Sequence, residues 1–221
     1  MTRPSGNGRN IRLCRIAVEQ DPDTGMEELS ARERAYCEMS VTRDRWTEWV
    51  AGRRAARKAV QALLGGSFQQ RPDTWDILPG PHGDPRVHGT PKPVWVSITH
   101  AAGMAVAVAS LAPIGVDMER PVSRAVADDV SFLRPEEARR VKSMPGTRRP
   151  KAATTYWTLK EAAAKAVGMV VSPFEISVRL DAARRTARLD VPGQEPALEG
   201  WFRQVGPCLL AVVRGRRKEV R

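Results

Sequence analysis

The sequence lacks an uninterrupted apolar run of about 18 residues, the length that a membrane-spanning helix requires. Its first residues, MTRPSGNGRNIR, contain no apolar core of the kind found in secretory leader peptides. Neither a membrane protein nor a secreted protein is therefore expected, and a cytoplasmic location is the default.

Cysteine and histidine are also scarce. The three cysteines, Cys14, Cys37 and Cys208, are odd in number and widely spaced, and no Cys-x-x-Cys occurs. This pattern disfavours both a disulfide framework and a zinc site, so we expect reduced and mostly buried thiols. His82 and His88 lie in a Pro- and Gly-rich loop and receive no functional assignment.

The composition is that of a globular protein, with 221 residues, 42% apolar and 28% charged. This length suits one large domain or two small ones. The formal charge of +11 favours an anionic partner, which could be nucleic acid, anionic lipid, a phosphate-rich ligand or an acidic protein. Part of the excess lies in residues 214–221, where we expect a solvated basic tail.

Patterns of periodicity and of turn residues predict an α+β protein. The predicted strands are residues 11–18, 75–78, 94–99, 104–111, 114–119, 176–180, 187–191, 200–204 and 208–214, and the predicted helices are 43–64, 131–144 and 151–167. Gly65 and Gly66 suit the end of the first helix, and Gly168 that of the last. Each half has a long helix and a closing pair of strands, so two similar lobes are expected, residues 1–111 and 112–221.

The strand around Asp117 carries the first candidate site. Because side chains alternate along a strand, Asp117 and Glu119 share one face while Val116 and Met118 share the other. Two carboxylates on one side repel each other, and a hard cation such as Mg²⁺ makes that arrangement favourable. The alternative is an exposed acidic face of a strand.

The helix that follows carries a third carboxylate. At about 100° per residue, Trp157, Glu161, Ala164 and Gly168 fall on one stripe, with Lys165 beside it. Glu161 is thus in line with a large aromatic residue and small residues. The alternative is an ordinary surface pair between Glu161 and Lys165, four residues apart on a helix.

The first long helix places two arginines where a core is expected. Its apolar stripe consists of Trp46, Trp49, Val50, Val60 and Leu64, and Arg53 and Arg57 lie within that stripe. Either the two stems extend along apolar surface to water, or the guanidiniums meet phosphate in a cleft. His100, predicted at the tip of a hairpin, and Thr99 beside it could also donate to a phosphate oxygen.

Together these segments resemble the phosphopantetheinyl transferases of the surfactin-synthetase-activating type. The family motifs match Gly115-Val116-Asp117-Met118-Glu119 and Trp157-Thr158-Leu159-Lys160-Glu161-Ala162-Ala163-Ala164-Lys165-Ala166-Val167-Gly168. Weaker matches are Ser97-Ile98-Thr99-His100 and Gly52-Arg53-Arg54-Ala55-Ala56-Arg57, so the resemblance covers residues 43–180. The chain departs from the family at Thr90, where a lysine is common, and at Ala101, where a small polar residue is common.

The resemblance implies two pseudo-symmetric subdomains of the phosphopantetheinyl transferase fold, with coenzyme A in the cleft between them. It implies that Asp117, Glu119 and Glu161 hold Mg²⁺ on the pyrophosphate. The residues that it assigns to coenzyme A are Arg53, Arg57, Thr99, His100, Lys160 and Lys165. Arg53, Arg57 and His100 would meet the phosphates of the nucleotide end, and Lys165 the α- or β-phosphate.

The implied reaction moves phosphopantetheine from coenzyme A to a serine of an acyl or peptidyl carrier protein and releases 3′,5′-ADP. Asp117, Glu161 and Lys165 would be catalytic, with Glu161, or a water that it holds on the metal, as the base. The expected partner is an acidic carrier protein of fatty acid, polyketide or peptide synthesis. The protein itself is expected to be a monomer that binds neither nucleic acid nor membrane.

Two other functions remain open from the residues alone. The first is a Mg²⁺-dependent nuclease, although such sites place the Glu and Lys two apart on a strand rather than four apart on a helix. The second is a non-catalytic nucleic-acid-binding module, which would leave the three carboxylates unexplained because acidic groups repel a polyanion.

Overall fold

The computed structural model describes residues 11–19, 21, 23–65 and 72–215. The chain divides into two compact units, Met1–Pro113 and Ile114–Arg221, which we call unit 1 and unit 2. Expectations for residues 1–10, for Gly66 and for the basic tail beyond residue 215 lie outside the described residues. No helix in the described part of the chain is long and apolar enough to cross a membrane.

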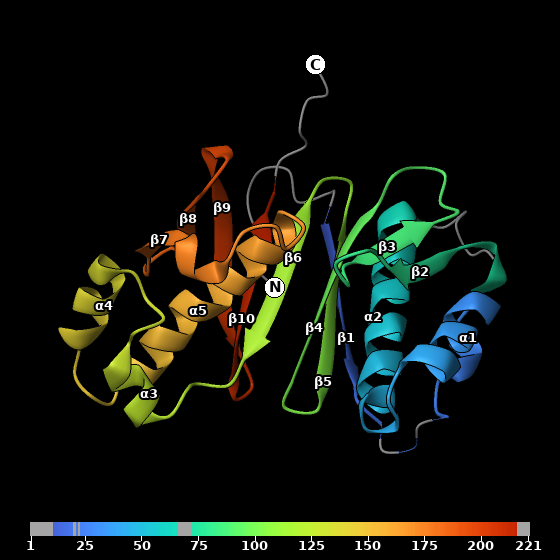
Figure 1. Cartoon of the computed structure of the whole chain (residues 1–221), viewed down its shortest axis with the longest axis horizontal. Coiled ribbons are helices and arrows are strands. Elements are labelled where there is room, and N and C mark those ends of the chain that lie inside the picture. Colours follow the sequence, from blue (N-terminus) through green and yellow to red (C-terminus); the bar gives the residue numbers. More distant parts are fainter. Residues whose placement is uncertain (1–10, 20, 22, 66–71, 216–221) are drawn as a thin grey trace. The chain divides into compact units, whose positions relative to one another are not determined.

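The described part of unit 1 combines an antiparallel sheet with helices (Figure 1). Its elements are β1 (Ile11–Ala17), α1 (Ala31–Ser40), α2 (Trp46–Leu64), β2 (Asp76–Pro79), β3 (Pro85–His88), β4 (Trp95–Ala101) and β5 (Met104–Ser110). The five strands lie in the order β1-β5-β4-β3-β2. The long helix α2 packs on β1, β5 and β4.

Unit 2 has the same plan. Its elements are β6 (Ile114–Glu119), α3 (Arg124–Asp129), α4 (Pro135–Lys142), α5 (Arg149–Ala166), β7 (Ser177–Asp181), β8 (Thr186–Val191), β9 (Gln194–Val205) and β10 (Cys208–Arg214). The strand order is β6-β10-β9-β8-β7, with every neighbouring pair antiparallel. Figure 1 shows α5 lying against β6 and β10.

The two sheets repeat one topology. Each strand of unit 1 has its counterpart five strands later in unit 2, because the orders β1-β5-β4-β3-β2 and β6-β10-β9-β8-β7 differ only in numbering. The long helix comes before four of the five strands in both units. The expected α+β class with two similar subdomains is therefore confirmed.

Small residues let each long helix approach its sheet. In unit 1, Ala55 and Ala59 of α2 are buried together with Ala105 and Ala107 of β5. Because alanine and glycine hold the backbones close together, side chains on neighbouring positions of helix and strand are brought within reach of one another.

Several expected elements differ from the observed ones. The segment 43–64 begins as a 3₁₀ turn, Arg43–Arg45, before α2. The helices α1 and α3 and the strand β3 were not expected, since each is short and lies in sequence rich in polar or turn residues. The hairpin is tighter than expected because Ala102 and Gly103 alone make the turn, both with positive φ.

Candidate functional site

Asp117 and Glu119 lie on the face of β6 that is turned towards α5. On that strand a Cβ added to Gly115 would stand 1.9 Å from the carbonyl oxygen of Ala162 on α5. Because side chains alternate, Asp117 and Glu119 project on the same face as Gly115, whereas Val116 and Met118 are fully buried on the other. The predicted alternation thus directs both carboxylates to the helix that carries Glu161.

Because Gly115 has no side chain, α5 can pack closely against β6. The added Cβ would also lie 2.6 Å from the backbone nitrogen of Ala166, so no larger residue fits without moving the helix. The glycine of the Gly-Val-Asp-x-Glu motif therefore has a packing function. It holds α5 against β6 at the turn of helix that bears Glu161 and Lys165.

The electrostatics show that the three carboxylates interact. Burial raises the pKa of Glu161, and the neighbouring Asp117 raises it further. Burial and then Asp117 likewise raise the pKa of Glu119, with a smaller contribution from Glu161. Lys165 opposes both shifts, and its Nζ lies 2.7 Å from Oδ1 of Asp117. The acidic cluster is therefore compensated in part by one ammonium group.

The donor set suits a hard divalent cation. Among the described residues, no three His, Cys, Asp or Glu side chains are gathered closely enough to hold a metal as they stand. Mg²⁺, however, is commonly bound through one or two carboxylates together with phosphate oxygens and water. Carboxylates that repel one another, with the ammonium of Lys165 paired to Asp117, fit that chemistry, because a cation already stabilises this position.

Trp157 continues the stripe of α5 that bears Glu161. Its ring makes an edge-on contact with Phe132, with centroids 5.7 Å apart, and a tilted contact with Phe174 at 5.6 Å. Phe174 is largely exposed. The expected stripe is therefore formed, and its aromatic end packs on the segments before and after α5.

Lys160 does not join this cluster. Its side chain is fully buried, and its Nζ lies 2.7 Å from Oε2 of Glu137 on α4. Burial lowers the pKa of Lys160, and Glu137 opposes that shift. In this structure the ammonium of Lys160 is therefore fixed inside unit 2 by a buried carboxylate, and its expected contact with coenzyme A stays a prediction.

Arg57 is fixed in a similar way in unit 1. Its Nη1 donates to Oε2 of Glu33 at 2.9 Å and to the carbonyl oxygen of Trp75, and its guanidinium lies 4.0 Å from the centre of the Trp75 ring. Burial lowers the pKa of Arg57, and Glu33 opposes the shift. With a side chain only 4% exposed, Arg57 is held in a buried ion pair in this structure, and its expected contact with a phosphate stays a prediction.

Arg53 is buried with weaker compensation. Its guanidinium stacks 4.6 Å from the centre of the Trp49 ring, and its Nε makes no hydrogen bond with the described residues. Burial lowers the pKa of Arg53 to about 10, and Glu33 opposes the shift. A buried guanidinium with unused hydrogen-bonding capacity is what a phosphate group would stabilise.

Gly52 and His100 explain why glycine precedes Arg53 in the helix motif. A Cβ added to Gly52 would lie 2.6 Å from Nε2 of His100 and 3.1 Å from Cγ2 of Ile98. The ring of His100 therefore rests against the backbone of α2 next to Arg53. His100 itself lies within β4, paired with Ala105, and not at the tip of the hairpin as expected.

Thr99 and His100 project from opposite faces of β4. His100 and Ile98 face α2, so the alternation of the strand turns the buried side chain of Thr99 the other way. The structure thus brings His100 and Arg53 together at Gly52 but directs the side chain of Thr99 away from them.

Two further residues were missed by the sequence reasoning. Glu33 forms a capping box with Ser30, the recognisable pattern of Ser followed three residues later by Glu. Glu137 caps α4 through the N–H of Arg134, after a Pro at the first position of the helix. That each glutamate pairs with a buried cation depends on tertiary packing, so the local sequence does not predict it.

Comparisons with known proteins cover both units. Residues 32–110 match the model of the 4′-phosphopantetheinyl transferase N-terminal domain, and residues 113–202 match that of the 4′-phosphopantetheinyl transferase superfamily. A Synechocystis sp. protein provisionally named as a 4′-phosphopantetheinyl transferase is 28% identical over 120 residues, 52% of this chain. That match spans about half of the relative's own length, 49%.

A solved structure also resembles part of the chain. It is Helicobacter pylori holo-[acyl-carrier-protein] synthase in complex with coenzyme A, 19% identical, with a TM-score of 0.34 over 45% of this chain and 97% of that one. The two family models, taken with the motifs on β6 and α5, settle the family. The chain belongs to the 4′-phosphopantetheinyl transferase superfamily and has the two-domain form, with the family's N-terminal domain followed by its superfamily domain.

Proposed function

We propose that this protein transfers 4′-phosphopantetheine from coenzyme A to a serine of an acyl or peptidyl carrier protein and releases 3′,5′-ADP. One observation carries the proposal. Asp117 and Glu119 on β6 interact electrostatically with Glu161 and Lys165 on α5, on one side of unit 2. Membership of the family supports the same reaction and favours it over a nuclease or a nucleic-acid-binding module.

Asp117, Glu119 and Glu161 would hold Mg²⁺ together with the pyrophosphate of coenzyme A. When bound, the ion supplies charge stabilisation for the phosphoryl oxygens during transfer. Lys165 reaches the same position from the helix and can turn from Asp117 to a phosphate oxygen, since its side chain is partly exposed. It would there stabilise the charge that builds on the oxygen of the leaving group.

Glu161 is the candidate general base. Burial and Asp117 raise its pKa, which brings the carboxylate closer to the basicity needed to accept the proton of a serine hydroxyl. Its position on α5 beside the β6 carboxylates would place that proton transfer next to the phosphate under attack.

Arg53 and His100 of unit 1 are the proposed contacts for phosphates at the nucleotide end of coenzyme A. The two side chains meet at Gly52, and the buried guanidinium of Arg53 has an Nε without a hydrogen bond. We do not include Arg57 and Lys160 among these contacts, because each is held in a buried ion pair.

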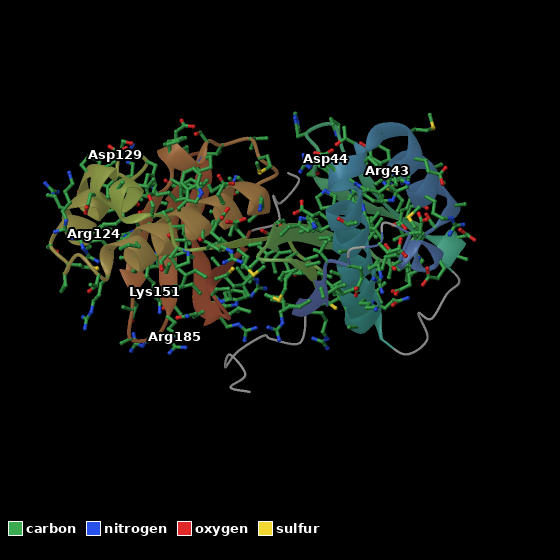
Figure 2. All side chains as sticks on the ribbon, turned by 90° about the horizontal axis from the view of Figure 1, so that it is seen from below. Arg43, Asp44, Arg124, Asp129, Lys151 and Arg185 are labelled. Carbon is green, nitrogen blue, oxygen red and sulfur yellow. The ribbon has the colours of Figure 1, made fainter. Side chains whose placement is uncertain are left out.

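The charge of unit 2 suits an acidic carrier protein. Between residues 120 and 151, Lys and Arg outnumber Asp and Glu. Arg124 and Lys151, labelled in Figure 2, are both exposed residues of this part of the chain. Val126, on α3 with Arg124, is 43% exposed and offers an apolar contact. Opposite charges of this kind accelerate association and favour the correct partner.

The experiment is mass spectrometry of an apo carrier protein incubated with the full chain, coenzyme A and Mg²⁺. A gain of one phosphopantetheine on the carrier serine, with equimolar 3′,5′-ADP by chromatography, is the expected result. An unmodified carrier in the presence of a folded protein, tested with both acyl and peptidyl carriers, would reject the proposal.

A further inference from the structure

The carboxylate of Glu137 joins three elements of unit 2. Its Oε2 accepts the N–H of Arg134 at the start of α4, at 2.9 Å, and lies 2.7 Å from Nζ of Lys160 on α5. Its Oε1 accepts the N–H of Val178 on β7 at 2.7 Å. Glu137 is 3% exposed and Lys160 is fully buried, so solvent does not weaken these contacts.

Unit 1 contains the same arrangement. Oε2 of Glu33 accepts the N–H of Ser30 at 2.8 Å and a hydrogen bond from Arg57 at 2.9 Å, while Oε1 accepts the N–H of Ile77 on β2 at 2.8 Å. Ser30 precedes α1 as Arg134 precedes α4. The repeated fold therefore includes a repeated buried ion pair that ties the long helix to a short helix and to an edge strand.

The residue after the cation differs between the units. In α5 it is Glu161, whereas in α2 it is Lys58, whose Nζ pairs with Glu28 at 3.2 Å. The strand pairing places Cys14 of β1 where β6 has Asp117, since each is paired with the central residue of the corresponding strand. Only unit 2 thus uses the position next to the cation for the carboxylate cluster.

Consecutive side chains on an α-helix point about 100° apart, so the direction of one fixes that of the next. Lys160 is held inward by Glu137, and this contact adds to the packing that fixes the rotation of α5 about its own axis. Glu161 is thereby turned towards Asp117, the neighbour that raises its pKa. A helix free to rotate by a fraction of a turn would carry Glu161 away from β6.

We propose that Lys160 is a positioning residue, which, through Glu137, orients Glu161 towards Asp117 and Glu119 for binding of the divalent ion. This inference rests on the proposed function, because it assumes that these carboxylates bind the ion. The two adjacent residues of the α5 motif then have separate roles. Lys160 holds the helix in its orientation, and Glu161 binds the divalent ion.

The test measures Mn²⁺ binding to the full chain by electron paramagnetic resonance, without coenzyme A, together with thermal unfolding. Lys160→Met should weaken Mn²⁺ binding about tenfold or more, the usual effect of removing a group that orients a metal ligand. Lys160→Arg should restore most of the affinity, because unit 1 shows that a guanidinium occupies the same position.

Arg57→Met is the matched control, since it removes the equivalent cation from the unit without the carboxylate cluster. It should lower the unfolding temperature while leaving Mn²⁺ affinity within about twofold, because Arg57 and the carboxylate cluster belong to different units. If the Lys160→Met variant does not fold, the double variant Glu137→Gln/Lys160→Met is used in the same test. A neutral pair of similar volume is commonly tolerated where a lone buried charge is not.

Equal Mn²⁺ affinities for the wild type and the folded Lys160 variant would overturn this inference alone. The same would follow if Arg57→Met weakened Mn²⁺ binding as strongly, since the effect would then reflect general stability. The proposed function requires that the wild type binds Mn²⁺ saturably and that Asp117→Asn abolishes this binding. If either result fails, the proposed function is overturned, and this inference with it.

Discussion

Nζ of Lys165 lies 2.7 Å from Oδ1 of Asp117 and joins the last turns of α5 to β6. The ammonium also opposes the rise in pKa of Glu119 and Glu161. Lys165 is thus the counter-ion of the acidic cluster in this state of the protein. A divalent ion that binds the same carboxylates must compete with it.

Lys165→Met should therefore separate metal binding from catalysis. Transfer to the carrier should slow about 10²- to 10³-fold, the range seen when one group that stabilises developing charge is removed. Mn²⁺ affinity without coenzyme A should be equal to that of the wild type or higher, because a competing cation is gone. Arg188→Met, which removes an exposed cation on β8, is the control. Loss of Mn²⁺ affinity in Lys165→Met would contradict this account.

The raised pKa of Glu161 predicts a stability effect with a definite sign. A carboxyl whose pKa is raised on folding binds more protons in the folded state, so the free energy of unfolding falls as pH rises above the ordinary pKa of Glu, 4.5. Glu161→Gln removes that cost and should stabilise the metal-free protein by about 0.5–1 kcal/mol near neutral pH. The gain should vanish below about pH 4.

Chemical denaturation with a metal chelator present checks this prediction across that pH range. Glu199→Gln, at an exposed position of β9, is the control and should change stability little at any pH. A Glu161→Gln variant that is less stable than the wild type near neutral pH would show that the carboxylate makes stabilising contacts in the metal-free state.

Gly115→Ala should disrupt unit 2. The new Cβ would meet the backbone of Ala162 at 1.9 Å and of Ala166 at 2.6 Å, which forces α5 away from β6. We expect a loss of more than about 3 kcal/mol, measured by denaturant unfolding. Gly200→Ala is the matched control, because its Cβ would meet only side-chain atoms at 3.0–3.1 Å, which can shift at a cost of about 1–3 kcal/mol. Equal losses in the two variants would argue against a special role for Gly115.

Gly52→Ala tests the proposed phosphate contacts of unit 1. The new Cβ would lie 2.6 Å from Nε2 of His100 and must displace the ring. The KM for coenzyme A should rise about tenfold while kcat changes little, because the variant leaves the carboxylate cluster intact. Steady-state kinetics with varied coenzyme A measure both constants.

A double-mutant cycle supplies the control for this prediction. Gly52→Ala combined with His100→Ala should regain stability, since the clash is relieved, but should not regain affinity for coenzyme A. If His100→Ala alone leaves KM unchanged, His100 does not contact the ligand.

The sequence predicted the parts of the site that depend on local geometry. Alternation along a strand was enough to put Asp117 and Glu119 on one face, and helical spacing was enough to align Trp157 with Glu161. The motifs also identified the family that the comparisons support. These features follow from the two backbone periods, which tertiary packing does not alter.

The direction of the basic side chains could not be predicted in this way. Arg57 was expected at a phosphate and Lys160 at coenzyme A, yet each is turned inward by a glutamate from another helix. That choice depends on contacts between elements far apart in the sequence. The short helices α1 and α3 were missed for a related reason, since packing stabilises them more than local propensity does.

The most direct test of the central claim compares pantetheine transfer by the wild type and by Glu161→Gln at saturating Mg²⁺ and coenzyme A. Labelled coenzyme A and an apo carrier report the rate, and circular dichroism verifies that the variant is folded. The account predicts that the wild type labels the carrier and that the variant is slower by about 10³-fold or more, since it loses both a metal ligand and the base. Labelling by folded Glu161→Gln at the wild-type rate would contradict it.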